Sequence, residues 1–401
     1  MRRVVIVGAS VAGVHAAQAL RAAGYDGDLQ LVSAEVEFPY DRPPLSKGFL
    51  LGTQEAVDIA LQPRSFYEEQ RIALLLGTRA TALDQHALTL ADGRRLTYDR
   101  LLLATGARLR RLEVPGGDLQ GVVYLRTFED ARALRERLAA AGRVVVVGGG
   151  FIGLEVASAA AQLGKKAVLL EALPAPLGHL LGEEVAQGLA QLHQEHGVEL
   201  VTGATVVRFA GDSAVRSVEV QDGRSFPCDL AVVGVGVAPN GELLGADGGI
   251  EVDSRLQTSM PGVFAAGDVA RFPLRGRHVR IEHWDIARAM GEHAARAMLG
   301  EDAPFEASPF FWSDQYDVTF QYFGHAERWD RMVLRGDLMA RSFVAFYLQG
   351  GAIGAAFTAG RPRDALPLRR LVDQAAHIDP DVLQREEFSL RRLSKGEQPG
   401  G

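Results

Sequence analysis

Two apolar runs of the same length begin two similar stretches of the chain. Residues 3–8 read RVVIVG and residues 143–148 read RVVVVG. A short β-branched run that ends at glycine is typical of a buried strand in a parallel sheet. Each run continues into a glycine-rich turn, an alanine-rich helix that ends at a glycine, and a second apolar run. These helices and second strands are expected at 12–23 and 29–33, and again at 153–163 and 167–170. The pattern predicts two β-α-β units.

The apolar pattern changes to a period of two after about residue 305. Residues 318–323 alternate in this way, and so do residues 342–348. The second run meets Gly350-Gly351 and a further apolar run, 352–357, which predicts an antiparallel hairpin with a two-residue turn. A helix is expected over 364–377. A third domain of the α+β class therefore follows the two β-α-β units.

The first glycine-rich turn fits the dinucleotide fingerprint G-x-G-x-x-G with one exception. Gly8 and Gly13 occupy the outer positions, and Ser10 replaces the middle glycine. The outer glycines permit the tight turn and close packing of helix on strand, and a small middle residue lets a pyrophosphate approach the helix N-terminus. An acidic residue should follow to hold ribose hydroxyls. Glu35 is the candidate, with a solvated loop glutamate as the alternative.

The second turn matches the fingerprint fully, with Gly148, Gly150 and Gly153 in GGGFIG. Phe151 and Ile152 lie within this turn, before the helix expected from residue 153, and are included in the predicted site. Glu171 ends the second strand of this unit, where a carboxylate favours free ribose hydroxyls and repels a 2′-phosphate. The sequence predicts that this site binds NAD rather than NADP.

Two dinucleotide sites in one chain indicate hydride transfer between two carriers, and NAD with FAD is the economical pair. A strand expected at 262–266 ends at Gly267-Asp268, where a carboxylate can accept hydrogen bonds from ribitol hydroxyls. A second strand ends at Ala104-Thr105-Gly106, a turn small enough to pass close to a pyrophosphate. The site prediction also includes Gly236.

Composition narrows the class of protein. The chain has 401 residues, a net charge of −7 and one cysteine. That length suits several domains, and the acidic balance argues against nucleic acid as a partner. With one cysteine the chain forms no internal disulfide and no cysteine zinc site, which suits a reducing compartment. No apolar run approaches a membrane span. We expect no membrane association, no metal site and a cytoplasmic location.

Several blocks resemble the FAD-containing, NADH-dependent ferredoxin reductases of bacterial oxygenase systems. The resemblance runs from about residue 4 to 373, and the most specific block is PYDRPPLSK at 39–47. It implies a glutathione-reductase-like fold, with the FAD domain split around an inserted NAD domain. The implied segments are 1–109 and 237–307 for FAD binding, 110–236 for NAD binding, and 308–401 for a C-terminal α+β domain.

The resemblance also implies individual roles around FAD. It places seven residues there: Ala12, Arg42, Lys47, Ala80, Arg126, Asp268 and Trp284. Arg126 would neutralise phosphate or cover the flavin edge, and Trp284 would present its backbone to the pyrimidine end of the ring. The chain departs from many relatives at Ala34, where they carry aspartate, and near Met290, where they often carry glutamine.

Lys47 and Glu155 are the predicted catalytic residues. In the family that the chain resembles, the lysine lies near flavin N5. Glu155 follows the second fingerprint and would face it. A lysine there stabilises negative charge on the flavin, and the glutamate holds the lysine in place. The alternative is a surface lysine and a glutamate favoured by the N-terminal end of a helix.

Cys228 distinguishes between relatives of this fold. Disulfide reductases need two cysteines near the flavin and NADH oxidases need one, but residues 36–60 contain none. Cys228 precedes an expected strand at 230–235 and is interpreted as a buried small hydrophobe. Electrons must then leave the flavin directly for an external acceptor. The histidines are interpreted as non-ligands, with three of them solvated: His179, His193 and His196.

Arginines follow two of the turns that are expected beside the flavin. They are Arg108, Arg110 and Arg111 in one group and Arg271, Arg275, Arg277 and Arg280 in the other. A local basic patch could steer an acidic ferredoxin to the flavin. The alternative is an arginine-biased solvated surface.

The sequence therefore predicts a flavoprotein oxidoreductase that passes electrons from NADH through FAD to a [2Fe–2S] ferredoxin. That ferredoxin would supply a cytochrome P450 or a Rieske-type oxygenase. The alternative enzymes are an NADH oxidase or a rubredoxin-type reductase. A different class is a redox-responsive interaction module similar to apoptosis-inducing factor.

Overall fold

The structure of the chain is a computed structural model that describes residues 1–306 and 308–397. It divides into two compact units, each built from three separate segments. The first unit comprises Met1–Pro43, Gln54–Arg110 and Val237–Ala307, and the second comprises Pro44–Thr53, Arg111–Gly236 and Ser308–Gly401. Pro44–Thr53 groups with the second unit, although the predicted first domain includes it. The predicted segments also extend over residues 307 and 398–401, which lie outside the described residues.

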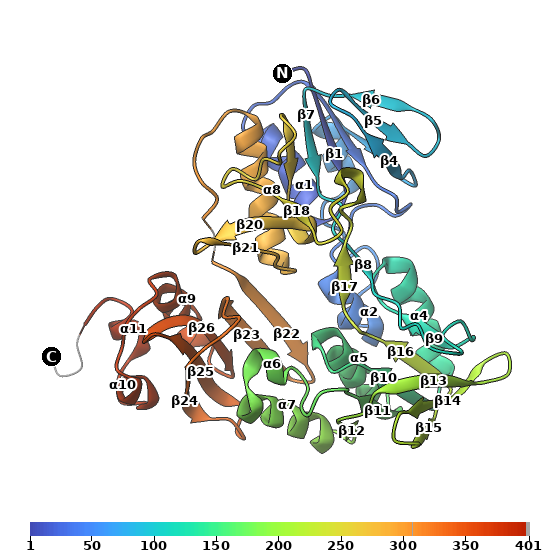
Figure 1. The fold of residues 1–401 in the computed structure, drawn as a ribbon, viewed down its shortest axis with the longest axis vertical. Coiled ribbons are helices and arrows are strands. Elements are labelled where there is room, and N and C mark those ends of the chain that lie inside the picture. The colour runs from blue at the N-terminus through green and yellow to red at the C-terminus, as the bar shows by residue number, and fades with distance from the viewer. Residues whose placement is uncertain (307, 398–401) are drawn as a thin grey trace. The chain divides into compact units, whose positions relative to one another are not determined.

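A parallel five-stranded sheet forms the centre of the first unit, in the order β19-β7-β1-β2-β3. Helices α1 and α8 pack against each other beside this sheet (Figure 1). Residues 4–7 of β1 are apolar and buried, as expected for a strand at the centre of a parallel sheet. The elements are β1 (Arg3–Val7), α1 (Val11–Ala22), β2 (Asp28–Val32), β3 (Ile72–Leu75), β7 (Arg100–Leu103), β19 (Val263–Ala265) and α8 (Trp284–Met298).

Three small sheets and short helices complete the first unit. Strands β4-β5-β6 form an antiparallel sheet, β17 pairs with β8, and β20 joins β18 to β21. The bounds are α3 (Arg64–Glu69), β4 (Ala80–Leu83), β5 (Ala87–Leu90), β6 (Arg95–Thr97), β8 (Ala107–Leu109), β17 (Val237–Pro239), η2 (Glu242–Leu244), β18 (Ile250–Glu251), η3 (Gly267–Val269), β20 (Ala270–Leu274) and β21 (Arg277–Val279).

The second unit contains another parallel sheet, in the order β12-β11-β10-β16-β9, with an antiparallel sheet β13-β14-β15. Helix α4 begins with a capping box in which Thr127 and Asp130 each bond the other's backbone N–H. The bounds are η1 (Pro43–Ser46), α2 (Gly48–Leu51), β9 (Val122–Tyr124), α4 (Phe128–Ala140), β10 (Arg143–Val147), α5 (Phe151–Gln162), β11 (Lys166–Leu170), α6 (Gly178–Leu181), α7 (Glu183–Glu195), β12 (Glu199–Val201), β13 (Val206–Gly211), β14 (Val215–Val220), β15 (Ser225–Pro227) and β16 (Leu230–Val233).

The C-terminal part of the second unit is an antiparallel sheet with helices packed on it (Figure 1). Its order is β22-β23-β26-β25-β24, and Gly350 and Gly351 turn β25 into β26 with positive φ angles of 57° and 83°. The bounds are β22 (Phe310–Gln315), β23 (Val318–Gly324), β24 (Arg331–Asp337), β25 (Ser342–Gln349), β26 (Ala352–Ala359), η4 (Pro362–Asp364), α9 (Ala365–Asp373), α10 (Pro380–Gln384) and α11 (Leu390–Leu393).

The two predicted β-α-β units and the predicted hairpin are confirmed within a few residues. The predicted helix over 364–377 is too long, because α9 ends at Asp373 and Ala375 adopts a left-handed φ of 44°. The strand expected at 230–235 ends at Val233, where glycine follows. In the part of the chain that the structure describes, no helix is long and apolar enough to cross a membrane.

Candidate functional site

The first fingerprint turn requires glycine because backbone groups approach it closely. Gly8 has a φ of 115°, and a Cβ atom there would lie 2.0 Å from the carbonyl oxygen of Ala104. A Cβ on Gly13 would lie 1.9 Å from the carbonyl oxygen of Gly8. Ser10 precedes α1, and its side chain makes no capping hydrogen bond. The turn therefore presents a helix N-terminus at the carboxyl end of β1, where a pyrophosphate fits.

Helix α8 makes an equally close contact with α1 that the sequence did not reveal. A Cβ on Gly291 would lie 2.1 Å from the carbonyl oxygen of Ala12, which is 5% exposed. Met290, where the chain departs from many relatives, is fully buried beside it. The available signal was the lone Gly291, because a glycine inside a helix often marks close packing.

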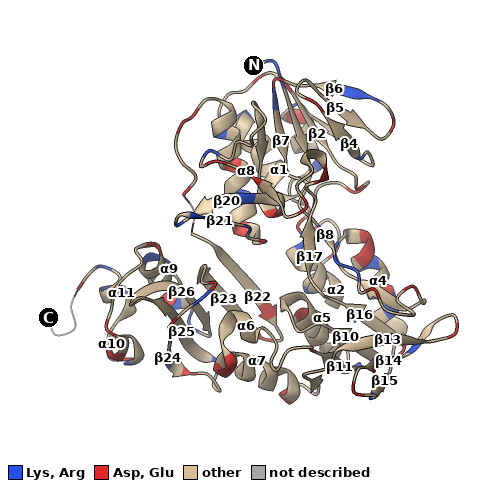
Figure 2. Cartoon of the chain, in the orientation of Figure 1, with Lys and Arg blue, Asp and Glu red and all other residues tan. Residues whose placement is uncertain are grey.

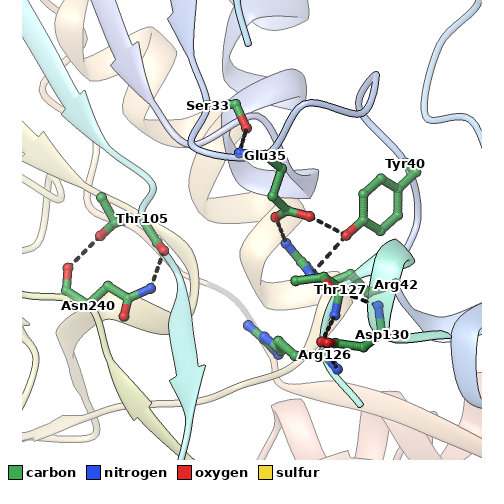
Figure 3. A network of polar contacts seen from close by, with 9 residues as sticks. All are labelled: Ser33, Glu35, Tyr40, Arg42, Thr105, Arg126, Thr127, Asp130 and Asn240. Atoms are coloured by element: carbon green, nitrogen blue, oxygen red, sulfur yellow. Dashed lines mark hydrogen bonds and ion pairs between the residues drawn. The ribbon is translucent and has the colours of Figure 1, made fainter. Parts of the chain in front are cut away.

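Glu35 lies in a polar network with Tyr40 and Arg42, shown in Figure 3. The Arg42 Nη2 donates to Glu35 Oε1 at 2.5 Å, and the Tyr40 hydroxyl donates to the other carboxylate oxygen. Burial acts to lower the pKa of Arg42, but Tyr40, Glu35 and Asp268 oppose it and the net direction is upward. Both Glu35 oxygens therefore have partners within the protein, so the ribose contact stays a prediction.

The Ala104–Gly106 turn is held by Asn240, a residue that the sequence did not single out. The Thr105 hydroxyl donates to the Asn240 carbonyl at 2.7 Å, and the Asn240 amide returns a bond to the Thr105 carbonyl at 2.9 Å (Figure 3). The Asn240 N–H also donates to Gly106, whose φ is 66°. The Thr105 hydroxyl thus stabilises the turn, which leaves the backbone as the surface for a ligand.

Asp268 and Trp284 lie at the ends of elements of the first unit. Asp268 follows β19 within η3, after Gly267 at a φ of 76°. Trp284 begins α8, and its indole N–H donates to Asp41 Oδ1 at 2.7 Å. Burial raises the pKa of Asp41, and the Trp284 bond opposes that shift. Ala80 begins β4, just beyond Thr78, whose N–H donates to the Ser33 carbonyl in the loop before Glu35.

The second fingerprint turn repeats the geometry of the first. Gly148 has a φ of 103°, and a Cβ there would lie 2.3 Å from the Gly234 carbonyl oxygen. A Cβ on Gly153 would lie 1.9 Å from the Gly148 carbonyl oxygen. Gly150 precedes α5, and Phe151 and Ile152 form its first turn, with Ile152 47% exposed. Gly236, with a φ of 88°, follows β16 by three residues.

Glu171 lies at the carboxyl end of β11, against the second fingerprint turn. Its Oε2 accepts from the Gly149 N–H at 2.5 Å and its Oε1 accepts from the Leu173 N–H at 2.7 Å. The residue is 9% exposed. Two backbone donors fix the carboxylate, which retains further lone pairs for hydroxyl groups.

Lys47 and Glu155 form the ion pair that was expected of them. Lys47 Nζ lies 2.8 Å from Glu155 Oε1, and their side chains are 15% and 2% exposed. Ser313 Oγ donates to the same oxygen at 2.6 Å, and Ser46 Oγ donates to Oε2. Three donors therefore converge on this nearly buried carboxylate and fix its position. The sequence did not single out either serine, because the resemblance assigned a role to Lys47 and Glu155 but none to Ser46 or Ser313.

Arg126 lies immediately before α4. Its backbone N–H donates to Asp130 Oδ2 at 3.1 Å, beside the capping box (Figure 3). The expected contact of Arg126 with phosphate or flavin stays a prediction.

The prediction that His193 is solvated is wrong. His193 has no exposed surface, and its burial lowers its pKa to about 4. The apolar period of α7 explains this, because Val185, Leu189 and Leu192 share its buried face. His179 and His196 are exposed, and His196 stacks on Tyr316.

Cys228 is buried at 1% exposure, as predicted, and burial raises its pKa to about 12. A thiol with that pKa is not a nucleophile at neutral pH. Within residues 1–306 and 308–397, no cluster of three or more histidine, cysteine or acidic side chains could hold a metal ion.

Several of the arginines that follow the Ala104–Gly106 turn and Asp268 form ion pairs with acidic side chains, which reduces the local positive charge. Arg108 pairs with Glu242, and Arg271 pairs with Glu251 at 3.1 Å. Arg280 pairs with Glu282 at 2.5 Å. Figure 2 shows basic and acidic residues interspersed on the elements of this unit. The basic patch is therefore weaker than the arginine count alone indicates.

The fold and the paired fingerprint turns define a two-dinucleotide oxidoreductase, and comparisons with known proteins agree. Residues 2–291 match the family described as "Pyridine nucleotide-disulphide oxidoreductase", and residues 310–394 match "Reductase C-terminal". The chain belongs to this family, and within it to the ferredoxin reductases of bacterial oxygenase systems.

Its relatives are similar over nearly their whole length. The chain is 38% identical to putidaredoxin reductase of Pseudomonas putida, over 97% of this chain and 96% of that protein. It is 42% identical to the ferredoxin--NAD(+) reductase component of the anthranilate 1,2-dioxygenase system of Burkholderia cepacia, over 96% and 98%. Among solved structures, the covalent putidaredoxin reductase–putidaredoxin complex matches with a TM-score of 0.95 and 38% identity, covering 98% of each chain.

Proposed function

We propose that the chain transfers electrons from NADH, through bound FAD, to a [2Fe–2S] ferredoxin that supplies a cytochrome P450 or a Rieske-type oxygenase. The observation that carries the proposal is the presence of two fingerprint turns with matching geometry, together with the buried Lys47–Glu155 pair. Each of the two turns can hold one dinucleotide. The relatives named as ferredoxin reductases of P450 and dioxygenase systems support the choice of acceptor.

The residues of the first unit fit FAD. Gly8 and Gly13 leave no room for a Cβ atom, so the turn packs tightly and the N-terminus of α1 lies at the carboxyl end of β1, where it can bind a pyrophosphate. The site that we assign comprises Gly8, Ser10, Ala12, Gly13, Glu35, Arg42, Ala80, Ala104, Thr105, Gly106, Asp268 and Trp284. When bound, FAD accepts a hydride from NADH and releases the electrons one at a time. Lys47 and Arg126 join this site on the family resemblance alone.

The residues of the second unit fit NADH. The site that we assign comprises Gly148, Gly150, Phe151, Ile152, Gly153, Glu171 and Gly236. The carboxylate of Glu171, fixed by two backbone N–H groups, can accept hydrogen bonds from ribose hydroxyls and would repel a 2′-phosphate. Lys47, held by Glu155, would stabilise the negative charge that develops as hydride is transferred. No side chain needs to remove a proton in that step.

The acceptor is proposed to be a separate protein, because this chain lacks the cysteines through which related disulfide reductases pass electrons from the flavin. Cys228 is the only cysteine of the sequence and is buried with a raised pKa. The single thiol also supports our proposal of a cytoplasmic location. We further propose the division into FAD segments 1–109 and 237–307, an NAD domain 110–236 and a C-terminal domain 308–401.

The test mixes the purified flavoprotein with NADH, a [2Fe–2S] ferredoxin and cytochrome c as the final acceptor. We expect ferredoxin-dependent cytochrome c reduction that is much faster with NADH than with NADPH. Omitting the ferredoxin is the control for direct reduction. Rapid oxygen consumption without ferredoxin would indicate an NADH oxidase instead. A slow, long-lived reduced complex would indicate an interaction module.

A further inference from the structure

Glu155 is the end of a chain of hydrogen bonds that extends away from Lys47 through the second unit. Ser313 Oγ donates to Glu155 Oε1 at 2.6 Å, and Gln315 Nε2 donates to Ser313 Oγ at 3.1 Å. Gln315 Oε1 lies 2.9 Å from His193 Nε2, and the Tyr316 hydroxyl lies 3.1 Å from His193 Nδ1. Four hydrogen bonds therefore connect Tyr316 to the carboxylate that holds Lys47.

The bonding partners fix the direction of every bond in this chain. Ser313 must donate its only hydroxyl proton to the carboxylate, so it accepts from the Gln315 amide. The Gln315 oxygen can then only accept, so His193 must carry its proton on Nε2. His193 Nδ1 is left as the acceptor for the Tyr316 hydroxyl. Each donor therefore points toward Glu155, and the bond dipoles add in one direction.

Burial makes this arrangement energetically important. Ser313 is 1% exposed, and Gln315 and His193 have no exposed surface. An unpaired polar group at such positions would be costly, whereas a fully bonded network fixes one arrangement of its side chains. Ser313 and Gln315 lie two residues apart on β22, so the period of the strand places both on the same face, where Ser313 meets Glu155 of α5 and Gln315 meets His193 of α7.

We propose that Ser313, Gln315 and His193 are positioning residues, which hold Glu155 and thereby Lys47 in the arrangement that hydride transfer requires. The inference rests on the proposed function. It gives the C-terminal domain a part in the site, because β22 supplies two of the three residues. It also explains why a polar histidine occupies the buried face of α7.

The first experiment measures reduction of the bound flavin by NADH in the holoenzyme, under anaerobic stopped-flow conditions. Ser313→Ala should lower the limiting rate constant about tenfold, since a hydrogen bond to a charged group is worth at least that factor. The concentration of NADH at half-maximal rate should stay within about twofold. The midpoint potential of the flavin should become more negative. Thr319→Ala, which removes an exposed hydroxyl that bonds Asp314 on the same hairpin, is the matched control and should change neither quantity.

Combining two substitutions distinguishes a positioning role of these residues from a loss of protein stability. Gln315→Met keeps the approximate shape but removes the bonds, so it should also slow reduction and shift the potential. Because Gln315 acts through Ser313, the double variant should be no slower than Ser313→Ala alone. Additive losses, or wild-type rates and potentials in both single variants, would overturn the inference. Failure of NADH to reduce the wild-type flavin would instead overturn the proposed function.

A measurement on the wild-type holoenzyme tests the direction of the hydrogen bonds themselves. In ¹⁵N-histidine-labelled protein, His193 should be neutral with its proton on Nε2 between pH 6 and pH 8. The signal that disappears in His193→Gln provides the assignment. A proton on Nδ1, or titration within that range, would reverse or break the chain and contradict the inference.

Discussion

At the residue scale, single backbone contacts decide where glycine is required. Gly8 and Gly24 both have positive φ angles, 115° and 84°. A Cβ on Gly24 meets nothing within 4 Å, whereas one on Gly8 meets the Ala104 carbonyl oxygen at 2.0 Å. The two positions therefore separate the cost of a left-handed backbone from the cost of a steric overlap.

We expect Gly24→Ala to lower the free energy of unfolding by about 1–2 kcal/mol, the cost of a left-handed alanine. Gly8→Ala should destabilise the protein further, because β1 and β7 must separate, and should reduce the FAD content. Thermal unfolding and the flavin-to-protein absorbance ratio of the two variants provide the comparison. Equal FAD contents would mean that the first turn does not hold the cofactor.

The Lys47–Glu155 pair yields a prediction that separates stability from catalysis. Lys47→Met leaves the buried Glu155 carboxylate without its cation, so the free energy of unfolding should fall by about 3–5 kcal/mol. Lys47→Met/Glu155→Gln removes both charges and should regain most of that loss. The rate of flavin reduction by NADH should stay low in both variants. Denaturant unfolding together with stopped-flow reduction tests this, and a double variant with the wild-type rate would exclude Lys47 from catalysis.

At the element scale, local patterns predicted the two glycine turns and the hairpin, and the family resemblance implied that Lys47 and Glu155 face each other. Neither source indicated Asn240 or Ser313, because their contacts join segments far apart in sequence and no recognised motif assigns them a role. The burial of His193 is an intermediate case. Its position on α7 continues the apolar face of Val185 and Leu189, so the helical period contained the information, but a polar side chain was assumed to face solvent.

Arg335 on β24 anchors a segment that has little other regular structure. Its buried guanidinium donates to the carbonyl oxygens of Leu383, Arg385, Glu386 and Phe388. Burial lowers the pKa of Arg335. The side chain thus connects the C-terminal sheet to residues between α10 and α11, where the backbone forms few bonds of its own.

Arg335→Met should release that segment, because four carbonyl groups lose their donor. We expect the free energy of unfolding to fall by about 3 kcal/mol, as for a buried charged hydrogen-bonding group. Limited proteolysis between residues 384 and 390 should accelerate. Arg331→Met, at the exposed start of the same strand, is the control. Protection from protease that equals the wild type would show that apolar packing alone holds the segment.

At the scale of the whole molecule, a protein with net charge −7 must attract an acidic partner through a local surface. The hairpin β20–β21 follows Asp268 directly and carries Arg271, Arg275 and Arg277. Arg271 pairs with Glu251, which weakens but does not reverse the positive charge of this hairpin. We therefore retain this hairpin as the predicted docking surface for ferredoxin.

Charge reversal of Arg271, Arg275 and Arg277 to glutamate should slow ferredoxin reduction about tenfold at low ionic strength, because electrostatic steering is lost. Ferricyanide reduction should be unchanged, since a small acceptor does not need the docking surface. Reversal of Arg79, Arg94 and Arg95, on the β4–β6 side of the same unit, gives the same net charge and is the matched control. The difference between the two variants should shrink at about 1 M salt, where the Debye length is about 3 Å. Equal slowing of both acceptors, or of both triple variants, would mean that this hairpin is an ordinary solvated surface and that ferredoxin docks elsewhere.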